Sequence, residues 1–165
     1  MKNIVLIGMP GAGKSTIGVV LAKKLGLRFL DSDLVIQDRC GMLLHEIMEK
    51  KGLEGFKEIE DQVNASLDVT NCVIATGGSA VYGKNAMTHL KEIGTVVYLK
   101  LSYEEISNRL GDLHERGVAL KPGQSLLSLY NERIPLYEEY ADIVVDCDGL
   151  MLRESVEYIV RQLKS

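Results

Sequence analysis

The segment that most constrains this chain is an eight-residue loop between a short apolar run, residues 4–7, and a stretch with helical spacing. It has the sequence Gly8-Met9-Pro10-Gly11-Ala12-Gly13-Lys14-Ser15, which fits the pattern G-x-x-x-x-G-K-[ST] of a phosphate-binding loop. Small residues let consecutive backbone N–H groups turn inward around phosphate oxygens, and the N-terminus of the following helix adds partial positive charge. Because the loop has the strand–loop–helix context that the motif requires, the sequence predicts a nucleoside triphosphate site.

Two side chains of this loop can take part in phosphate chemistry directly. Lys14 can reach the β- and γ-phosphates, and the hydroxyl of Ser15 can ligate Mg²⁺. The alternative is a glycine-rich turn that binds no nucleotide. We expect the nucleotide to contact a run of neighbouring residues: Gly11, Ala12, Gly13, Lys14, Ser15 and Thr16.

Segments typical of strands and helices alternate along the rest of the chain. This alternation predicts an α/β fold with one five-stranded parallel sheet flanked by helices on both faces, in a single domain spanning residues 1–165. Polar residues with Gly and Pro fill 111–123, which is long for a simple connection and favours a lid; a surface loop without function is the alternative. The expected strands are 4–7, 28–30, 72–75, 95–101 and 143–145, and the expected helices are 15–25, 34–67 with breaks at Gly41 and Gly52, 84–93, 103–110, 126–137 and 150–163.

Charge and composition exclude several classes of protein. The net charge of −4 argues against a general nucleic-acid-binding surface. No apolar run approaches the ~20 residues of a membrane span, and the first strand begins too early for a signal peptide. Three cysteines without metal-ligand spacing indicate reduced, mostly buried thiols. We therefore expect a cytoplasmic monomer that binds neither membrane nor nucleic acid.

Three loops follow strands of the expected sheet, so they should face one crevice beyond the carboxyl ends of the strands. They are the phosphate loop, Asp31-Ser32-Asp33 and Thr76-Gly77-Gly78-Ser79. One carboxylate of the second loop can hold a Mg²⁺-bound water while the other accepts a proton from an acceptor hydroxyl, as phosphoryl transfer requires. The alternative for either Asp is to cap the next helix. The glycines of the third loop allow close backbone approach to a ligand, or form an ordinary turn.

Taken together, these motifs resemble those of shikimate kinases. The resemblance runs from about Lys2 to Asp146 and includes, in order, the phosphate loop, Asp31-Ser32-Asp33, Gly-Phe-Lys-x-x-Glu at Gly55–Glu60, the Gly-Gly turn and Arg-x-Pro-Leu-Tyr-x-x-Tyr-Ala-Asp at Arg133–Asp142. It implies a P-loop kinase that uses ATP and Mg²⁺ to phosphorylate a small carboxylated acceptor, most simply shikimate.

The resemblance also implies roles for individual residues. Lys14 and Ser15 would serve ATP and Mg²⁺, Asp31 would contact Mg²⁺ through water, and Asp33 would bind the acceptor hydroxyl as base. Gly77 and Gly78 would lie against the acceptor.

Three arginines complete the implied site. Arg133 would pair with the acceptor carboxylate, for which a bidentate guanidinium is suited; the alternative is a solvated side chain paired with Glu132 or Glu138. Arg109 would stack on adenine, or be merely solvated. Arg116, in the lid, would reach the transferring phosphate.

The departures from the family pattern fall on the acceptor and lid side. Lys57 stands where the family has an arginine that grips the acceptor carboxylate, Ser79 stands for a third glycine, and the lid sequence around Arg116 is unusual. A lysine keeps the charge but loses the planar two-donor fork. Besides a shikimate kinase, the sequence therefore allows a related kinase acting on another hydroxy acid or polyol, and a nucleotide-binding sensor with little catalysis.

Overall fold

Five strands form one all-parallel sheet in the computed structural model, which describes residues 2–110 and 118–165. The strands are β1 (Asn3–Ile7), β2 (Arg28–Asp31), β3 (Cys72–Ala75), β4 (Gly94–Lys100) and β5 (Ile143–Asp146). Their order in the sheet is β2-β3-β1-β4-β5. The predicted five-stranded parallel sheet is therefore confirmed, with strand ends that match the expected positions or differ from them by one residue.

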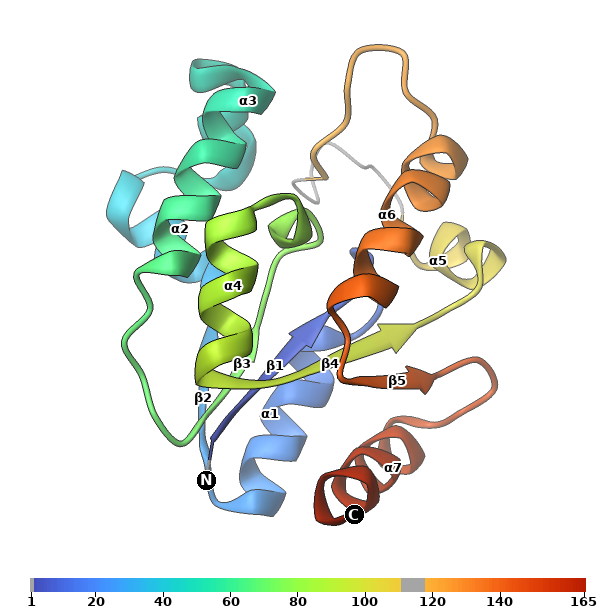
Figure 1. Cartoon of the computed structure of the whole chain (residues 1–165). Coiled ribbons are helices and arrows are strands. Elements are labelled where there is room, and N and C mark those ends of the chain that lie inside the picture. The colour runs from blue at the N-terminus through green and yellow to red at the C-terminus, as the bar shows by residue number, and fades with distance from the viewer. Residues whose placement is uncertain (1, 111–117) are drawn as a thin grey trace.

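Helices cover both faces of this sheet, as predicted. Figure 1 shows α1 and α7 on one face and α4 and α6 on the other. A short 3₁₀ helix, η1, was not anticipated, and α6 runs through Pro135 to end three residues later than expected. The helices are α1 (Lys14–Leu25), α2 (Ser32–Cys40), α3 (Leu44–Ala65), η1 (Ala80–Tyr82), α4 (Lys84–Ile93), α5 (Tyr103–Arg109), α6 (Leu126–Tyr140) and α7 (Leu152–Lys164).

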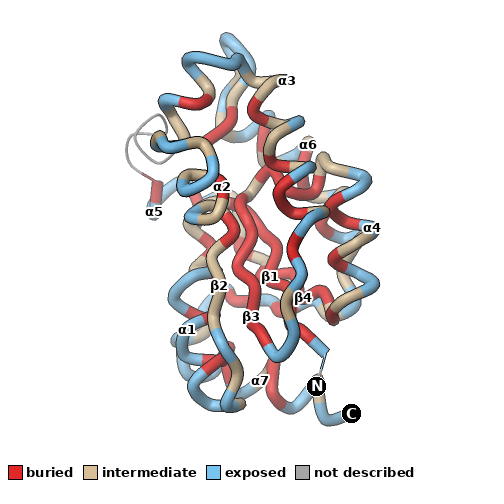
Figure 2. The backbone as a smooth tube through the Cα atoms, turned by 90° about the vertical axis from the view of Figure 1, so that its left-hand side faces the viewer, coloured by how far each residue is buried: buried red, intermediate tan, exposed pale blue. Residues whose placement is uncertain are grey.

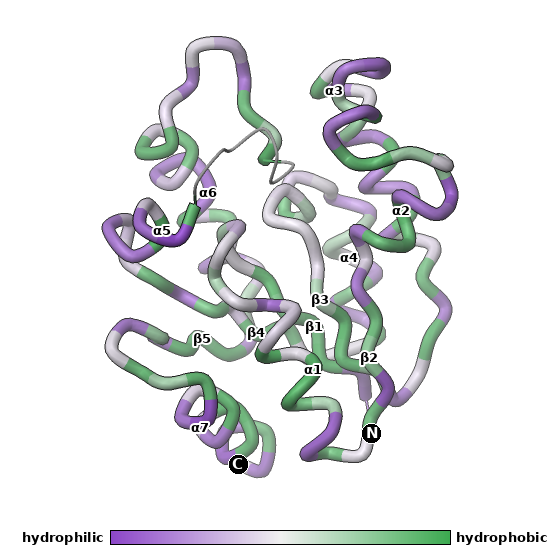
Figure 3. The backbone as a smooth tube through the Cα atoms, turned by 180° about the vertical axis from the view of Figure 1, so that it is seen from behind, coloured by the Kyte–Doolittle hydropathy of each residue, from purple (hydrophilic) through white to green (hydrophobic). Residues whose placement is uncertain are grey.

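The main hydrophobic core lies around the three central strands. All residues of β1 and β3 are buried, as Figure 2 shows in red. A strand covered by helices on both faces needs apolar side chains in both directions, which explains the unbroken run Ile4–Ile7. Figure 3 shows the same pattern from behind, where hydrophobic residues follow the central strands and hydrophilic residues dominate α5. No described helix is long and apolar enough to cross a membrane.

A second, smaller core supports α2 and α3. It consists of Ile36, Ile47, Phe56, Val63 and Ala119. The expected helix breaks are present nearby: Gly41 ends α2 with φ 67°, and Gly52 interrupts α3 with φ 75° and ψ 172°. Because Ala119 comes from the segment before α6, this smaller core ties α2 and α3 to a distant part of the chain.

The strand register places the functional loops at one edge of the sheet. Leu6 of β1 and Asp31 of β2 both lie opposite Ala75 of β3. The phosphate loop, the start of α2 and the turn after β3 therefore leave the sheet at the same level, as the sequence analysis expected for a common crevice.

Candidate active site

The phosphate loop joins β1 to α1 in a conformation that depends on its glycines. Gly8, Gly11 and Gly13 have φ values of 151°, 83° and 92°, a region that other residues rarely adopt. At Gly8 a Cβ would also lie 2.8 Å from the carbonyl oxygen of Leu99 on β4. The loop is therefore fixed by backbone geometry and by close contact with the neighbouring strand.

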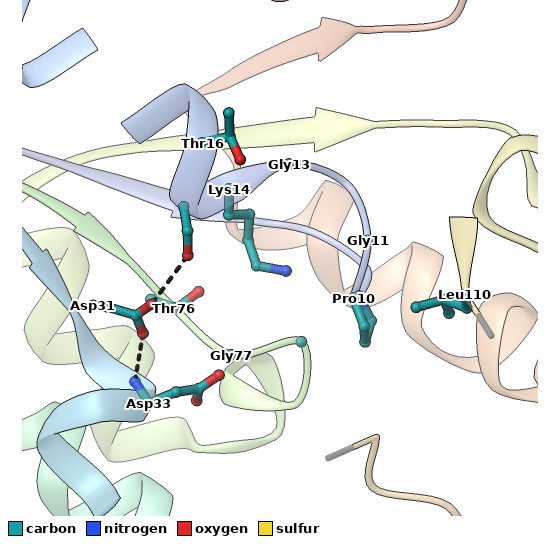
Figure 4. Close-up of a pocket in the computed structure, with 12 residues that line it drawn as sticks. Pro10, Gly11, Gly13, Lys14, Thr16, Asp31, Asp33, Thr76, Gly77 and Leu110 are labelled. Atoms are coloured by element: carbon teal, nitrogen blue, oxygen red, sulfur yellow. Dashed lines mark hydrogen bonds between the residues drawn. The ribbon is translucent and has the colours of Figure 1, made fainter. Parts of the chain in front are cut away.

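Lys14 is buried at the start of α1, and its ammonium group is held inside the loop. Its Nζ donates hydrogen bonds to the carbonyl oxygens of Gly8 at 2.6 Å and Met9 at 2.9 Å. Burial lowers the pKa of Lys14 to about 8, although the nearby Asp33 carboxylate raises it. Figure 4 shows the amine pointing into the space between the phosphate loop and Asp33. A cation so placed can neutralise phosphate charge in that space.

Asp31 is both a helix cap and a partner of the phosphate loop. Its Oδ1 accepts a hydrogen bond from the backbone N–H of Asp33 at 3.0 Å, which caps α2, and its Oδ2 accepts one from the Ser15 hydroxyl at 3.0 Å. Asp31 thus caps α2, which was the alternative considered for it, and it also contacts Ser15, as a residue at the expected Mg²⁺ site should. One expectation needs correction: Asp31-Ser32-Asp33 is not a loop before a helix at residue 34, because α2 begins directly at Ser32 and Asp33 lies in its first turn.

A cavity of about 360 Å³, here named the main cavity, lies between these loops. Asp33 lines it, and Oδ1 of Asp33 has no hydrogen-bond partner among the described residues. Burial, and then the neighbouring Asp31, raise the pKa of Asp33 to about 6, while Lys14 lowers it. The residues lining the main cavity are Pro10, Gly11, Gly13, Lys14, Ser15, Thr16, Asp31, Asp33, Thr76, Gly77, Gly78 and Leu110.

A second hollow of about 20 Å³, the inner pocket, adjoins the main cavity. The two share four residues: Pro10, Asp33, Gly77 and Gly78. At Gly77 a Cβ would lie 2.5 Å from Oδ1 of Asp33. At Gly78 it would lie 2.7 Å from Cδ of Pro10 and 2.8 Å from Nη1 of Arg133. Neither glycine leaves room for a side chain, so backbone forms this wall.

Arg133 reaches the inner pocket from α6 and is 1% exposed. Its Nη2 donates to the carbonyl oxygen of Ala119 at 3.2 Å and its Nε to the Tyr82 hydroxyl at 3.4 Å. The alternative of a solvated arginine is therefore excluded. One helical turn further on, the Tyr137 hydroxyl donates to the carbonyl oxygen of Gly78 at 2.6 Å. Tyr137 lies in the motif at Arg133–Asp142, but no role was predicted for it because nothing in the sequence couples it to a turn so distant along the chain.

Glu60 on α3 supplies a second carboxylate to the inner pocket and is buried. Its Oε1 accepts a hydrogen bond from the Ser79 hydroxyl at 2.6 Å. Burial raises the pKa of Glu60 to about 7, and the hydrogen bond from Ser79 opposes this rise. No role was predicted for Glu60 from the sequence, although it follows Lys57 by three residues and so shares its helix face.

Lys57 does not line the inner pocket. Its Nζ lies 4.1 Å from the centre of the Tyr82 ring and 4.0 Å from Oε1 of Glu54. Tyr82 in turn lies under the guanidinium of Arg133, at 5.4 Å. Lys57 is thus beside the pocket rather than in it, and its proposed contact with a substrate stays a prediction.

A third cavity of about 200 Å³, the side cavity, opens on the other side of the phosphate loop. Arg109 of α5 lines it and donates to the carbonyl oxygen of Gly11 at 3.0 Å and to Glu105 at 3.0 Å. The side cavity lies where a nucleotide base attached to phosphates in the main cavity could extend. Its lining residues are Ala12, Gly13, Thr16, Ile17, Arg109, Cys147, Leu150, Leu152 and Ser155; of these, Ile17 and the last four were not anticipated.

The expected lid is only partly described. Arg116 and the rest of residues 111–117 lie outside the described residues. Of the remainder, Val118 and Ala119 are buried and line the inner pocket, and Nζ of Lys121 lies 3.2 Å from Oε1 of Glu132. This end of the expected lid is therefore attached to α6.

The donor set fits a magnesium ion that is shared with phosphate. Within residues 2–110 and 118–165, no three His, Cys, Asp or Glu side chains gather into a metal cage. The hydroxyl of Ser15 and the carboxylate of Asp31 do meet at the edge of the main cavity. Magnesium usually takes one or two protein oxygens and completes its shell with waters and substrate phosphates, so this pair is sufficient.

Comparisons with known proteins agree with this geometry. A family model described as shikimate kinase matches residues 10–164. Over 167 residues the chain is 42% identical to the shikimate kinase of Pseudomonas paraeruginosa, covering 99% of this chain and 97% of that protein. The structure is similar to shikimate kinase from Acinetobacter baumannii in complex with shikimate, with a TM-score of 0.84 and 32% identity over 99% of this chain and 93% of that one. It is also similar to shikimate kinase from Aquifex aeolicus, with a TM-score of 0.83 and 33% identity over 98% and 96% of the two chains.

Proposed function

Because the chain belongs to the shikimate kinase family, we propose that it transfers the γ-phosphoryl group of ATP to a hydroxyl group of shikimate. The observation that carries this proposal is the position of Asp33. This carboxylate lines both the main cavity and the inner pocket, and one of its oxygens has no partner among the described residues. A base in that position can serve a hydroxyl group in the inner pocket while phosphate occupies the main cavity.

The donor half consists of the phosphate loop and the residues beside it. Backbone N–H groups of residues 11–16 surround the phosphates, and Lys14 neutralises their charge. The Ser15 hydroxyl, and Asp31 through water, would hold Mg²⁺, which when bound offsets charge on the β- and γ-phosphates. Arg109 lines the side cavity, where its guanidinium can stack on the adenine ring.

The acceptor half binds and orients the hydroxyl that is phosphorylated. Oδ1 of Asp33 accepts the proton of that hydroxyl, whose oxygen bonds to the γ-phosphorus while the bond to the β-phosphate oxygen of ATP breaks and ADP leaves. With a pKa of about 6, Asp33 is ionised at neutral pH and still basic enough to take a proton. The buried guanidinium of Arg133 can pair with the acceptor carboxylate, and Gly77 and Gly78, which have no side chains, would let the backbone lie against the acceptor.

The placement of Lys57 favours a second candidate function. Because its ammonium group lies over the Tyr82 ring and outside the inner pocket, the carboxylate clamp depends on Arg133 among the described residues. A related kinase acting on a polyol, which has no carboxylate, would need no such clamp, whereas one acting on another hydroxy acid would use Arg133 in the same way. A nucleotide-binding sensor would need neither Asp33 nor Arg133 in this arrangement, and is disfavoured.

An acceptor screen tests these possibilities. ADP release from ATP and Mg²⁺ is measured with shikimate and with a panel of hydroxy acids and polyols, and phosphorus NMR identifies the product. We expect phosphorylated shikimate, and loss of turnover in Asp33→Ala but not in Asp38→Ala, which removes an exposed carboxylate from the same helix. Turnover on another acceptor supports the related kinase, and ATP binding without any turnover supports the sensor. The cytoplasmic location and the monomeric state stay predictions.

A further inference from the structure

The hydrogen bond between Ser79 and Glu60 joins two segments that both line the inner pocket. Ser79 precedes η1 and is 6% exposed, and Glu60 lies on α3 and is 2% exposed. Their 2.6 Å contact spans 19 residues of sequence, so it is a tertiary contact. The backbone of Ser79, at φ −92° and ψ 1°, is one that any residue can adopt. The backbone therefore does not require a serine at this position, and the reason for the serine lies in what its hydroxyl group contacts.

The other carboxylate oxygen of Glu60 is directed at the turn that we assign to the acceptor. Oε2 is buried and has no hydrogen-bond partner among the described residues. It would lie 3.0 Å from a Cβ at Gly77, beside Oδ1 of Asp33 at 2.5 Å. Two unpartnered carboxylate oxygens thus approach the same glycine, and a buried oxygen of this kind calls for a hydrogen-bond donor.

We propose that Ser79 is a positioning residue for the acceptor: its hydroxyl holds the Glu60 carboxylate so that Oε2 faces the inner pocket and accepts a hydrogen bond from a hydroxyl group of shikimate. This inference rests on the proposed function for the identity of the acceptor. The hydrogen bond from Ser79 fixes one oxygen of Glu60, which leaves the other in a defined orientation.

The charges around Glu60 make this hydrogen bond important near neutral pH. Lys57 on α3 and Arg133 on α6 favour the ionised form of Glu60, whereas Asp33 on α2 opposes it, and burial raises its pKa to about 7. Lys14 on α1 and Tyr137 on α6 also face this group. Since the hydrogen bond from Ser79 lowers the pKa of Glu60, its removal leaves more of the carboxyl group protonated at pH 7.

The experiment compares wild type with Ser79→Ala, which removes only the hydroxyl. Shikimate affinity is measured by calorimetry at pH 7 and pH 9. We expect Ser79→Ala to weaken binding about tenfold at pH 7, the effect of one hydrogen bond to a charged group, and less than about threefold at pH 9, where Glu60 is ionised in both proteins. In the Glu60→Gln background, Ser79→Ala should lose this dependence on pH. Ser66→Ala, which removes a hydroxyl elsewhere near α3, should bind as wild type does.

A second measurement separates this inference from the proposed function. The side-chain carboxyl carbon of Glu60, assigned with Glu60→Gln, is titrated by NMR without any acceptor. Ser79→Ala should raise the pKa of Glu60; an unchanged titration would overturn the inference, as would a loss of affinity equal at both pH values. If wild type neither binds nor phosphorylates shikimate, the proposed function fails, while the Glu60 titration still decides whether Ser79 controls this carboxylate.

Discussion

Replacing Asp33 with asparagine should stabilise the protein while it stops phosphoryl transfer. A carboxylate with a pKa raised from 3.8 to about 6 costs about 3 kcal/mol of stability at a pH where it is ionised in both the folded and the unfolded states. Asparagine has nearly the same shape and no charge, so it removes this cost. Part of the gain is lost because Lys14 no longer has Asp33 as a counter-charge. We therefore expect a net gain of about 1–3 kcal/mol.

The stabilisation by Asp33→Asn should depend on pH, because the stability of wild type falls as Asp33 becomes ionised. The folded state binds the proton of Asp33 more tightly than the unfolded state does, so wild type loses stability as pH rises from the unfolded pKa of 3.8 to the folded pKa of about 6. Above that range the loss is complete, and below it there is none. The advantage of Asp33→Asn should therefore be full at pH 8 and disappear towards pH 4.

Urea unfolding of the ligand-free protein at pH 8, 6 and 4.5 measures how far Asp33→Asn changes the free energy of unfolding from that of wild type. Thermal unfolding is followed at pH 8 as a second measure. At pH 8 the midpoint of thermal unfolding should rise by about 3–10 °C, while kcat falls by at least about 100-fold. Asp38→Asn, on an exposed position of the same helix, controls for the substitution and should change neither quantity. A variant that is less stable than wild type at pH 8, or equally stabilised at all three pH values, would refute the argument that desolvation raises the pKa of Asp33.

Three further substitutions test other parts of the site. Lys14→Met removes the ammonium group inside the phosphate loop and should abolish turnover in the ADP-release assay; persistent activity would contradict the phosphate-loop assignment. Gly77→Ala puts a Cβ 2.5 Å from Oδ1 of Asp33 and 3.0 Å from Oε2 of Glu60, so kcat/KM for shikimate should fall by about 100-fold or more, with an unchanged circular dichroism spectrum as the check on folding. Lys57→Arg should lower the KM for shikimate because a guanidinium offers two parallel donors; no change, or a loss, would indicate a different acceptor.

The parts of the site that lie close together in sequence were predictable. The phosphate loop follows from the spacing of its glycines and of Lys14, and the parallel sheet from the alternation of its elements. The common crevice follows from a general property of such sheets. In each case the information lies within a few residues or in a repeated pattern.

The parts that depend on distant contacts were not predictable. The start of α2 at Ser32 was missed because Asp31 caps the helix without any break between strand and helix. The hydrogen bonds from Ser79 to Glu60 and from Tyr137 to Gly78 join segments separated by 19 and 59 residues. Side-chain placement such as that of Lys57 over Tyr82 depends on packing, which no local pattern records.

Because Arg133 and Tyr137 lie one turn apart on α6, we expect the acceptor half of the site to open more readily than the phosphate loop. A single local opening of α6 withdraws both side chains from the turn at Gly78, whereas the phosphate loop is anchored between β1 and α1 in the buried centre of the sheet. Amide hydrogens of the turn at 77–78 should therefore exchange together with those of α6, and faster than those of β1.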